Sequence, residues 1–117
     1  ETVFASTDAP ATDFSGKLVH VPADSGRPAL NLCEGIRRIE SDSSEPSALE
    51  VDLWSASAEI PAGDRLRLEI SSSNFPRFDA HPNLSGNPAH ATEARVARQR
   101  IHHAAETPSF LELHLLL

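Results

Sequence analysis

The sequence contains no methionine, no tyrosine, one tryptophan and one cysteine among its 117 residues. A single cysteine cannot form a disulfide within the chain, so we expect Cys33 to be reduced and to pack as a small apolar side chain. The lack of an initiator methionine indicates a processed chain or a piece of a longer one. The sequence has no run of about 20 apolar residues, which a membrane-spanning helix requires, and no basic-then-apolar leader. We therefore expect no membrane partner and no signal peptide, and a cytoplasmic location is favoured over a secreted one.

Positive charge and helix-compatible windows are scarce as well. The chain has 10 Lys and Arg against 17 Asp and Glu, a net charge of −7, whereas binding a nucleic-acid backbone requires a clustered cationic face. Nine prolines are spread from Pro10 to Pro108, and proline is disfavoured inside helices but tolerated at strand ends and turns. These shortages argue against nucleic acid as a partner and favour one β-rich domain over residues 1–117.

Three segments alternate apolar and polar residues with a period of two, as strands with one buried face do. They are Leu49–Leu53, Arg65–Ser71 and Phe110–Leu117. Their predicted inward-facing side chains are Leu49, Val51, Leu53, Leu66, Leu68, Ile70, Leu111, Leu113 and Leu115. Further strands are predicted at Thr2–Ala5, Phe14–Val21 and Leu30–Ile39, and the pattern in Phe14–Val21 leaves open which alternate set faces the core.

Two local features qualify this list of strands. Gly35 interrupts the apolar pattern of its segment, which indicates a bulge or a close backbone approach. Segment Thr92–Ala105 has a helix-favouring composition, but Arg98, Arg100 and His102 would share one face of a strand. A strand is favoured there.

Two connections are long. Ile39–Ser47 is polar and acidic, which is typical of a solvated loop, and Asn74–Thr92 is a loop of roughly twenty residues, a length that compact domains rarely keep without a role. Near its start lie five candidate docking residues: Asn74, Phe75, Arg77, Phe78 and Asp79. The segment either packs on its own sandwich or docks on another domain, since aromatic and Arg side chains are favoured at interface centres. Arg77 is expected to pair with Asp79 or with a group across the interface.

The residue types that carry chemistry do not form a convincing site in this sequence. Ser71-Ser72-Ser73 follows a strand, but no Gly-x-Ser-x-Gly nucleophile elbow occurs. His102, His103, Glu106 and His114 are interpreted as surface residues, because adjacent strand positions point to opposite faces. Trp54 would suit a sugar platform, although a lone Trp at a strand end more often packs internally. We therefore expect no catalytic residue, no metal and no cofactor in this chain.

Several segments resemble a known family. They are Phe4–Pro10, Thr12–Phe14, Lys17–Val19, Asn31–Ile36, Asp52–Trp54, Ala62–Asp79 and the tail from His102 to Leu111. In this order they are similar to the C-terminal domain of X-Pro dipeptidyl-peptidases and cocaine-esterase-like serine hydrolases, and the run Ser71–Asp79 is the most specific part of the match.

The resemblance implies an all-β fold, a jelly-roll β-sandwich like that of galactose-binding domains. It implies a non-catalytic domain, the C-terminal portion of a larger hydrolase chain. Such a domain packs on an upstream α/β-hydrolase catalytic domain that holds the Ser/Asp/His triad, and a homo-oligomer is possible. The substrate, an ester or an X-Pro peptide, stays open. The alternative is an independent carbohydrate- or protein-binding β-sandwich module, because a fold alone does not fix a function.

Overall fold

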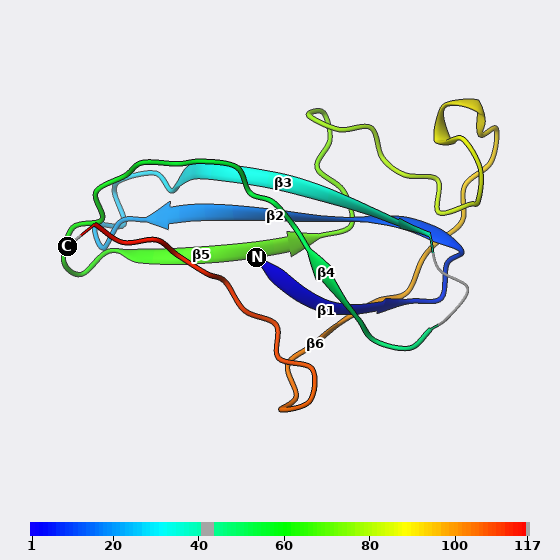
Figure 1. Ribbon diagram of the computed structural model, residues 1–117. Helices are drawn as coiled ribbons and strands as arrows, with labels where there is room; N and C mark the ends of the chain where they lie inside the picture. Colours follow the sequence, from blue (N-terminus) through cyan, green and yellow to red (C-terminus); the bar gives the residue numbers. More distant parts are fainter. Residues whose placement is uncertain (41–43, 117) are drawn as a thin grey trace.

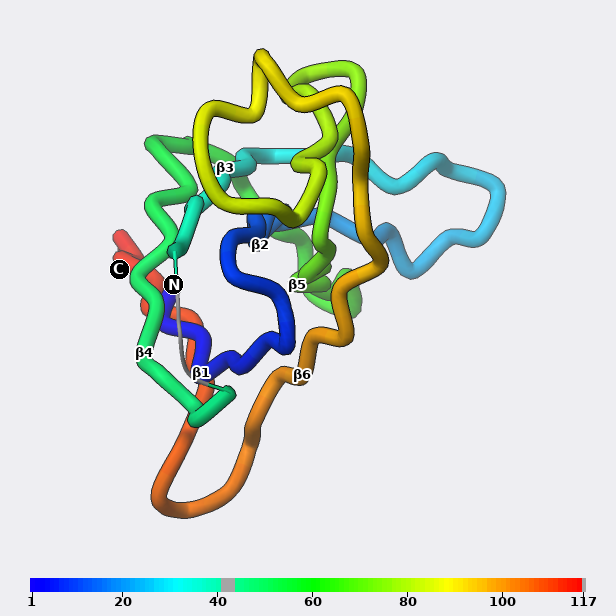
Figure 2. The backbone as a smooth tube through the Cα atoms, turned by 90° about the vertical axis from the view of Figure 1, so that its right-hand side faces the viewer, coloured from blue at the N-terminus to red at the C-terminus, as the bar shows by residue number. Residues whose placement is uncertain are grey.

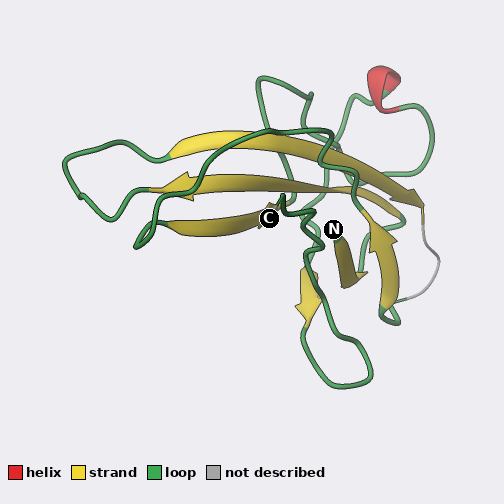
Figure 3. Ribbon diagram, turned by 60° about the vertical axis from the view of Figure 1, so that its left-hand side comes forward, coloured by secondary structure: helices red, strands yellow, loops and turns green. Residues whose placement is uncertain are grey.

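The computed structural model describes residues 1–40 and 44–116, and its regular elements are almost all strands (Figure 1). In chain order they are β1 (Thr2–Thr7), β2 (Ala11–Val21), β3 (Leu30–Glu40), β4 (Ser47–Glu50), β5 (Arg65–Ser71), a single 3₁₀ turn η1 (Pro88–His90) and β6 (Gln99–His102). The described residues contain no α-helix, and hence no helix that could span a membrane. Figure 3 shows η1 within the long loop that joins β5 to β6. The all-β class is confirmed.

The strands form two antiparallel three-stranded sheets, with orders β4-β1-β6 and β3-β2-β5. Figure 2 shows them as two layers, with β3, β2 and β5 in the upper half of the view and β4, β1 and β6 in the lower half. The core lies between the layers and consists of Val3, Ala5, Phe14, Leu18, Leu49, Val51 and Leu53. Because both sheets contribute to one core, the fold is a β-sandwich.

The predicted inward-facing residues divide into three groups. Leu49, Val51 and Leu53 belong to the core, whereas Leu68, Ile70 and Leu111 pack against it while partly exposed. The prediction is wrong for Leu66, Leu113 and Leu115, which are exposed. Leu66 lies on β5, an edge strand with a neighbour on one side only, and the other two lie on a segment that pairs with no strand.

The predicted strand Phe110–Leu117 is wrong over its described part. Only Phe110 forms a bridge, to Thr2, and residues 111–116 belong to no ladder. The reason is that β4 pairs with β1 on one side and β6 pairs with Phe4–Thr7 on the other, so only the start of β1 is left for this segment. Leu117 lies outside the described residues. Alternation predicts an extended segment, but a strand also needs a partner.

The predicted strand Leu49–Leu53 is shorter in the structure, where β4 ends at Glu50. Residues 51–53 belong to no strand, because the chain there passes over β3. The crossing point is Gly35, where an added Cβ would overlap the Asp52 carbonyl oxygen and lie 2.8 Å from the carbonyl carbon. The close backbone approach predicted at Gly35 is therefore confirmed. Since the crossover needs this gap, glycine is the only residue that fits.

β2 is buried on both faces, which settles the question that its alternation left open. Phe14 and Leu18 face the core. On the other face Asp13 is buried in a bidentate pair with Arg38, with N···O distances of 2.8 and 3.0 Å, and the Ser15 hydroxyl donates to the Ser71 carbonyl at 3.2 Å. A central strand with neighbours on both sides can thus bury polar side chains that are fully paired.

The other predicted strands are confirmed, with bounds that differ from the prediction. Thr2–Ala5, Phe14–Val21 and Leu30–Ile39 extend to the bounds of β1, β2 and β3. Within Thr92–Ala105 only Gln99–His102 forms a strand.

The molecule presents an unusually large surface for its mass. Its radius of gyration is 16.0 Å, whereas a compact domain of this length has about 13 Å. Its accessible surface is 8130 Å², against about 6,200 Å² expected for a folded monomer of the same mass. The excess, about 1,900 Å², is larger than the roughly 800 Å² that one partner contributes to a standard protein interface.

A candidate docking surface

Glu34 of β3 is the point at which the loop after β5 attaches to the sandwich. Its Oε2 accepts hydrogen bonds from the side-chain amides of Asn74 at 2.7 Å and Asn31 at 3.1 Å. Its Oε1 lies 3.2 Å from the Arg77 guanidinium, and the Lys17 ammonium is 4.0 Å from Oε2. The Asn74 hydrogen bond above all, then that of Asn31 and the two cations, hold the pKa of Glu34 below its usual range, although partial burial opposes the shift. The carboxylate is therefore charged at neutral pH.

Two of the five predicted docking residues fasten the loop to its own sheet, and a third, Phe78, contacts one of these two. Asn74 is buried and bonded to Glu34. Arg77 pairs with Glu34 instead of Asp79, and its guanidinium carbon also lies 5.5 Å from the centre of the half-buried Phe78 ring. Of the two expected partners of Arg77, Asp79 is not the one found, because Glu34 offers a carboxylate that the fold brings to the loop. A partner across an interface stays a prediction.

The other two predicted residues face outward. Phe75, which precedes a cis peptide bond to Pro76, is 73% exposed, and Asp79 is exposed as well. The loop thus both packs on its own sandwich and displays side chains to a neighbour. A docking role for the five residues stays a prediction.

Trp54, which was expected from the sequence to pack internally, is exposed. The side chain is 77% exposed, so the expectation of internal packing is wrong. Leu53 is buried in the core, and the backbone then turns at Trp54 with a φ of 66°, held by a 2.7 Å hydrogen bond from its N–H to Asp52 Oδ1. L-residues rarely adopt positive φ, so this backbone conformation is uncommon for a tryptophan. It directs the indole away from the core.

Trp54 lies between two hollows of the surface. One, of about 300 Å³, is shared with Glu34 and Arg77. The other, of about 390 Å³, is lined by Leu111 and Leu113 among others. We define the docking surface as Trp54, Arg77 and the two hollows beside them. It combines a large aromatic and an anchored guanidinium, which are residue types favoured at interface centres, with rims of mixed polar and apolar side chains.

The histidines and serines weighed for chemistry lie elsewhere. His102 is half-buried on β6 and its Nε2 is 2.9 Å from the Ser6 hydroxyl, whereas His103 is exposed and His114 lies 3.6 Å from Glu112. Within residues 1–40 and 44–116, no carboxylate contacts the His102 ring, which a nucleophilic triad would require. In the same residues no three potential metal ligands cluster.

The triplet Asn83-Leu84-Ser85 matches the pattern of an N-glycosylation acceptor, but its asparagine side chain is hydrogen-bonded within the fold. The Asn83 amide oxygen accepts from Thr12 Oγ1 at 2.7 Å, and its amide nitrogen donates to the Arg95 carbonyl at 2.9 Å. Both polar atoms of the side chain are therefore engaged in holding the long loop to β2.

The fold described above is an all-β sandwich of two antiparallel three-stranded sheets. The family model of the X-Pro dipeptidyl-peptidase C-terminal non-catalytic domain matches residues 2–112, so the chain belongs to this family. It is also similar to a cocaine esterase of Rhodococcus sp. (strain MB1 Bresler), with 35% identity over 126 aligned residues. The alignment covers 97% of this chain and 22% of the esterase, so the chain spans about a fifth of that relative. The predicted resemblance is confirmed.

Proposed function

We propose that this chain is the non-catalytic C-terminal domain of a larger serine hydrolase and that its docking surface packs on an upstream α/β-hydrolase catalytic domain. The family match supports the non-catalytic assignment. The relative is an esterase of which this chain spans 22%, which supports a parent with further domains. The parent reaction is acyl transfer from an ester or X-Pro peptide to a serine of the catalytic domain, followed by hydrolysis.

The observation that carries the docking assignment is Trp54. An indole that is 77% exposed and held outward by a positive-φ turn leaves a large apolar area in water, and burial of an aromatic side chain in a partner is strongly favourable. Arg77 lies beside it and is oriented in advance by Glu34 and Phe78. A side chain that is ordered before binding loses less entropy when the complex forms.

The physical task of the domain is then to cover the catalytic domain and to keep it rigid. The excess surface of this chain exceeds the usual contribution of one partner. No group of this chain is required to touch the reacting atoms for that task. The domain acts by stabilising the fold that carries them.

The test is a comparison of Trp54→Ala and Arg77→Ala with Val96→Ala in the parent polypeptide. Val96 is a matched control, since its side chain is 86% exposed and lines none of the hollows around Trp54. We expect Trp54→Ala and Arg77→Ala to lower the melting temperature and aryl-ester turnover of the parent. In the 117-residue chain alone, Trp54→Ala should shift stability by no more than an ordinary surface change, about 0.5 kcal/mol. Equal behaviour of Trp54→Ala and Val96→Ala in the parent would refute the assignment.

Two further measurements separate the alternatives. Trp54 is the only tryptophan of the chain, so its fluorescence reports directly on the surface. Binding of oligosaccharides by the isolated chain, lost in Trp54→Ala, would replace the proposal with a carbohydrate-binding module. Sedimentation velocity tests the homo-oligomer: a dimer abolished by Trp54→Ala would assign the surface to a second copy.

A further inference from the structure

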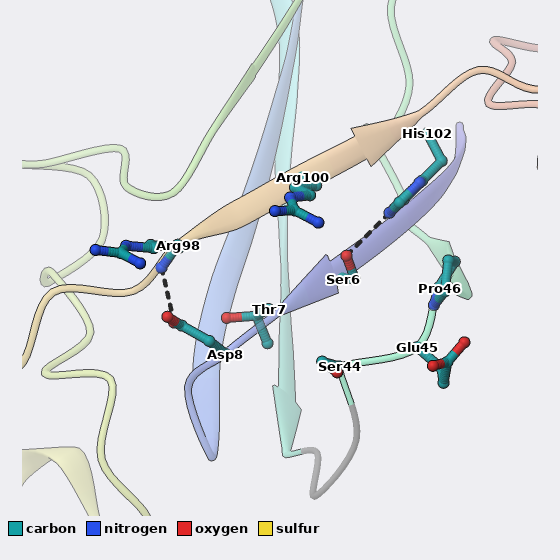
Figure 4. A pocket seen from close by; sticks show the side chains of 9 residues that line it. All are labelled: Ser6, Thr7, Asp8, Ser44, Glu45, Pro46, Arg98, Arg100 and His102. Atoms are coloured by element: carbon teal, nitrogen blue, oxygen red, sulfur yellow. Dashed lines mark hydrogen bonds between the residues drawn. The ribbon is translucent and has the colours of Figure 1, made fainter.

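A separate groove of about 480 Å³ lies on the sheet formed by β4, β1 and β6 (Figure 4). Arg98, Arg100 and His102 occupy alternate positions along β6 and the residue before it, so they share one face. Ser6 of β1 is the cross-strand partner of Arg100 and its hydroxyl is 2.9 Å from His102 Nε2. The groove therefore collects two guanidiniums, one imidazole and a buried hydroxyl.

The two arginines have no partner in the described chain. Neither the Arg98 nor the Arg100 guanidinium forms an ion pair or a hydrogen bond with any residue in 1–40 or 44–116. Asp8, at the rim, accepts the backbone N–H of Arg98 at 2.8 Å and lies 4.0 Å from the Arg95 guanidinium. Glu45, also at the rim, has an interaction of its own. A chain of net charge −7 thus places two arginines at one groove, and neither guanidinium is paired with a residue of the described ranges.

We propose that this groove binds an oxyanion group, a phosphate or a carboxylate, of a small ligand. Arg98 and Arg100 are two residues apart, about 6.6 Å at the spacing of an extended chain, and both line the groove. Figure 4 shows the Arg98 side chain directed away from Arg100, so a change of its rotamer is needed for both to reach one anion. A guanidinium presents a planar pair of N–H donors that matches a carboxylate or phosphate. The Ser6 hydroxyl and the His102 ring provide further polar contacts at the floor. This site lies on the opposite sheet from Glu34 and does not depend on the docking assignment.

The test is a titration of the 117-residue chain with inorganic phosphate, followed by the amide NMR signals. Ionic strength is kept constant with sodium chloride, because unspecific attraction is screened by salt. Saturable shifts are expected at Ser6, Thr7 and Arg98–His102. Arg100→Gln should weaken phosphate binding by about tenfold or more, as expected when charge-assisted hydrogen bonds are lost. Arg37→Gln is the matched control, since Arg37 is an exposed arginine of the other sheet, and it should leave the affinity unchanged.

Parallel titrations with sulfate and succinate identify the source of the oxyanion. Saturation by phosphate and sulfate assigns a phosphoryl-type ligand, whereas saturation by succinate alone assigns a carboxylate, and either result supports the site. The proposal is overturned if no anion gives saturable shifts. It is also overturned if Arg100→Gln and Arg37→Gln weaken binding equally, because the effect then belongs to net charge and not to the groove.

Discussion

Replacement of Gly35 by alanine tests the crossover that carries Trp54. The new Cβ would overlap the Asp52 carbonyl oxygen, so the crossing segment must move away from β3. Val51 and Leu53 flank Asp52 and are 1% and 8% exposed, so the movement removes part of their core contacts. Overpacking costs about 1–3 kcal/mol, and burial of one such side chain contributes about 1.5–3 kcal/mol. We therefore expect Gly35→Ala to destabilise the chain by about 2–4 kcal/mol, which is a large fraction of the total for a domain of this size.

Urea unfolding measures this loss. With a slope of about 2 kcal/mol per molar, the midpoint should fall by about 1–2 M while the slope is unchanged. Gly26→Ala is the control, because a Cβ there meets only the flexible Asp24 side chain at 3.2 Å. The emission of Trp54 should change in Gly35→Ala and stay constant in Gly26→Ala. Equal midpoints for the two variants would show that the crossover does not depend on the absence of a side chain at Gly35.

Two pH effects follow from paired groups in the structure. The pKa of Glu34 is lowered from 4.5 mainly by the Asn74 hydrogen bond, so its contribution is present above pH 4.5 and is lost as the pH falls through the lowered value. When the pH is lowered from about 6 to about 3, the urea midpoint should fall more steeply in the wild type than in Glu34→Gln. Parallel curves of midpoint against pH would contradict this. Burial lowers the pKa of His81 from 6.5, and its neutral Nδ1 accepts the Asn83 N–H at 2.9 Å, so this contribution is complete above pH 6.5 and is lost below it. His81→Asn keeps an acceptor that does not titrate, so the urea midpoint of this variant should depend less on pH below 6.5 than that of the wild type. An equal pH dependence of the two midpoints would refute the role of His81.

The strands were predictable where alternation coincided with an available partner. Arg65–Ser71 became β5 because β2 offers it an edge. The tail from Phe110 has an equally regular pattern, but β6 already pairs with Phe4–Thr7 on that side of β1, so only the bridge to Thr2 forms. Local periodicity shows which face of an extended segment is apolar. It does not show whether another strand has a free edge with which the segment can pair.

The candidate surface was partly predictable for a related reason. The Asn74–Asp79 segment stood out by composition, but its anchor Glu34 is 40 positions away from Asn74 along the chain, and no local spacing links them. The outward direction of Trp54 goes with a positive-φ turn next to the point where the chain passes Gly35, which lies far away along the sequence. Side-chain identity indicated interface chemistry, whereas long-range packing determined which of these residues face outward.

The pairing of β1 has a consequence for the order in which the domain can assemble. Thr2 pairs with Glu50 and Phe4 pairs with His102, so the first strand of the chain waits for the last one to be synthesised. Such non-local closure makes folding slow and leaves unpaired strand edges exposed in the meantime. During translation β2 and β3 can form a hairpin early, but the opposite sheet stays open until β6 has left the ribosome.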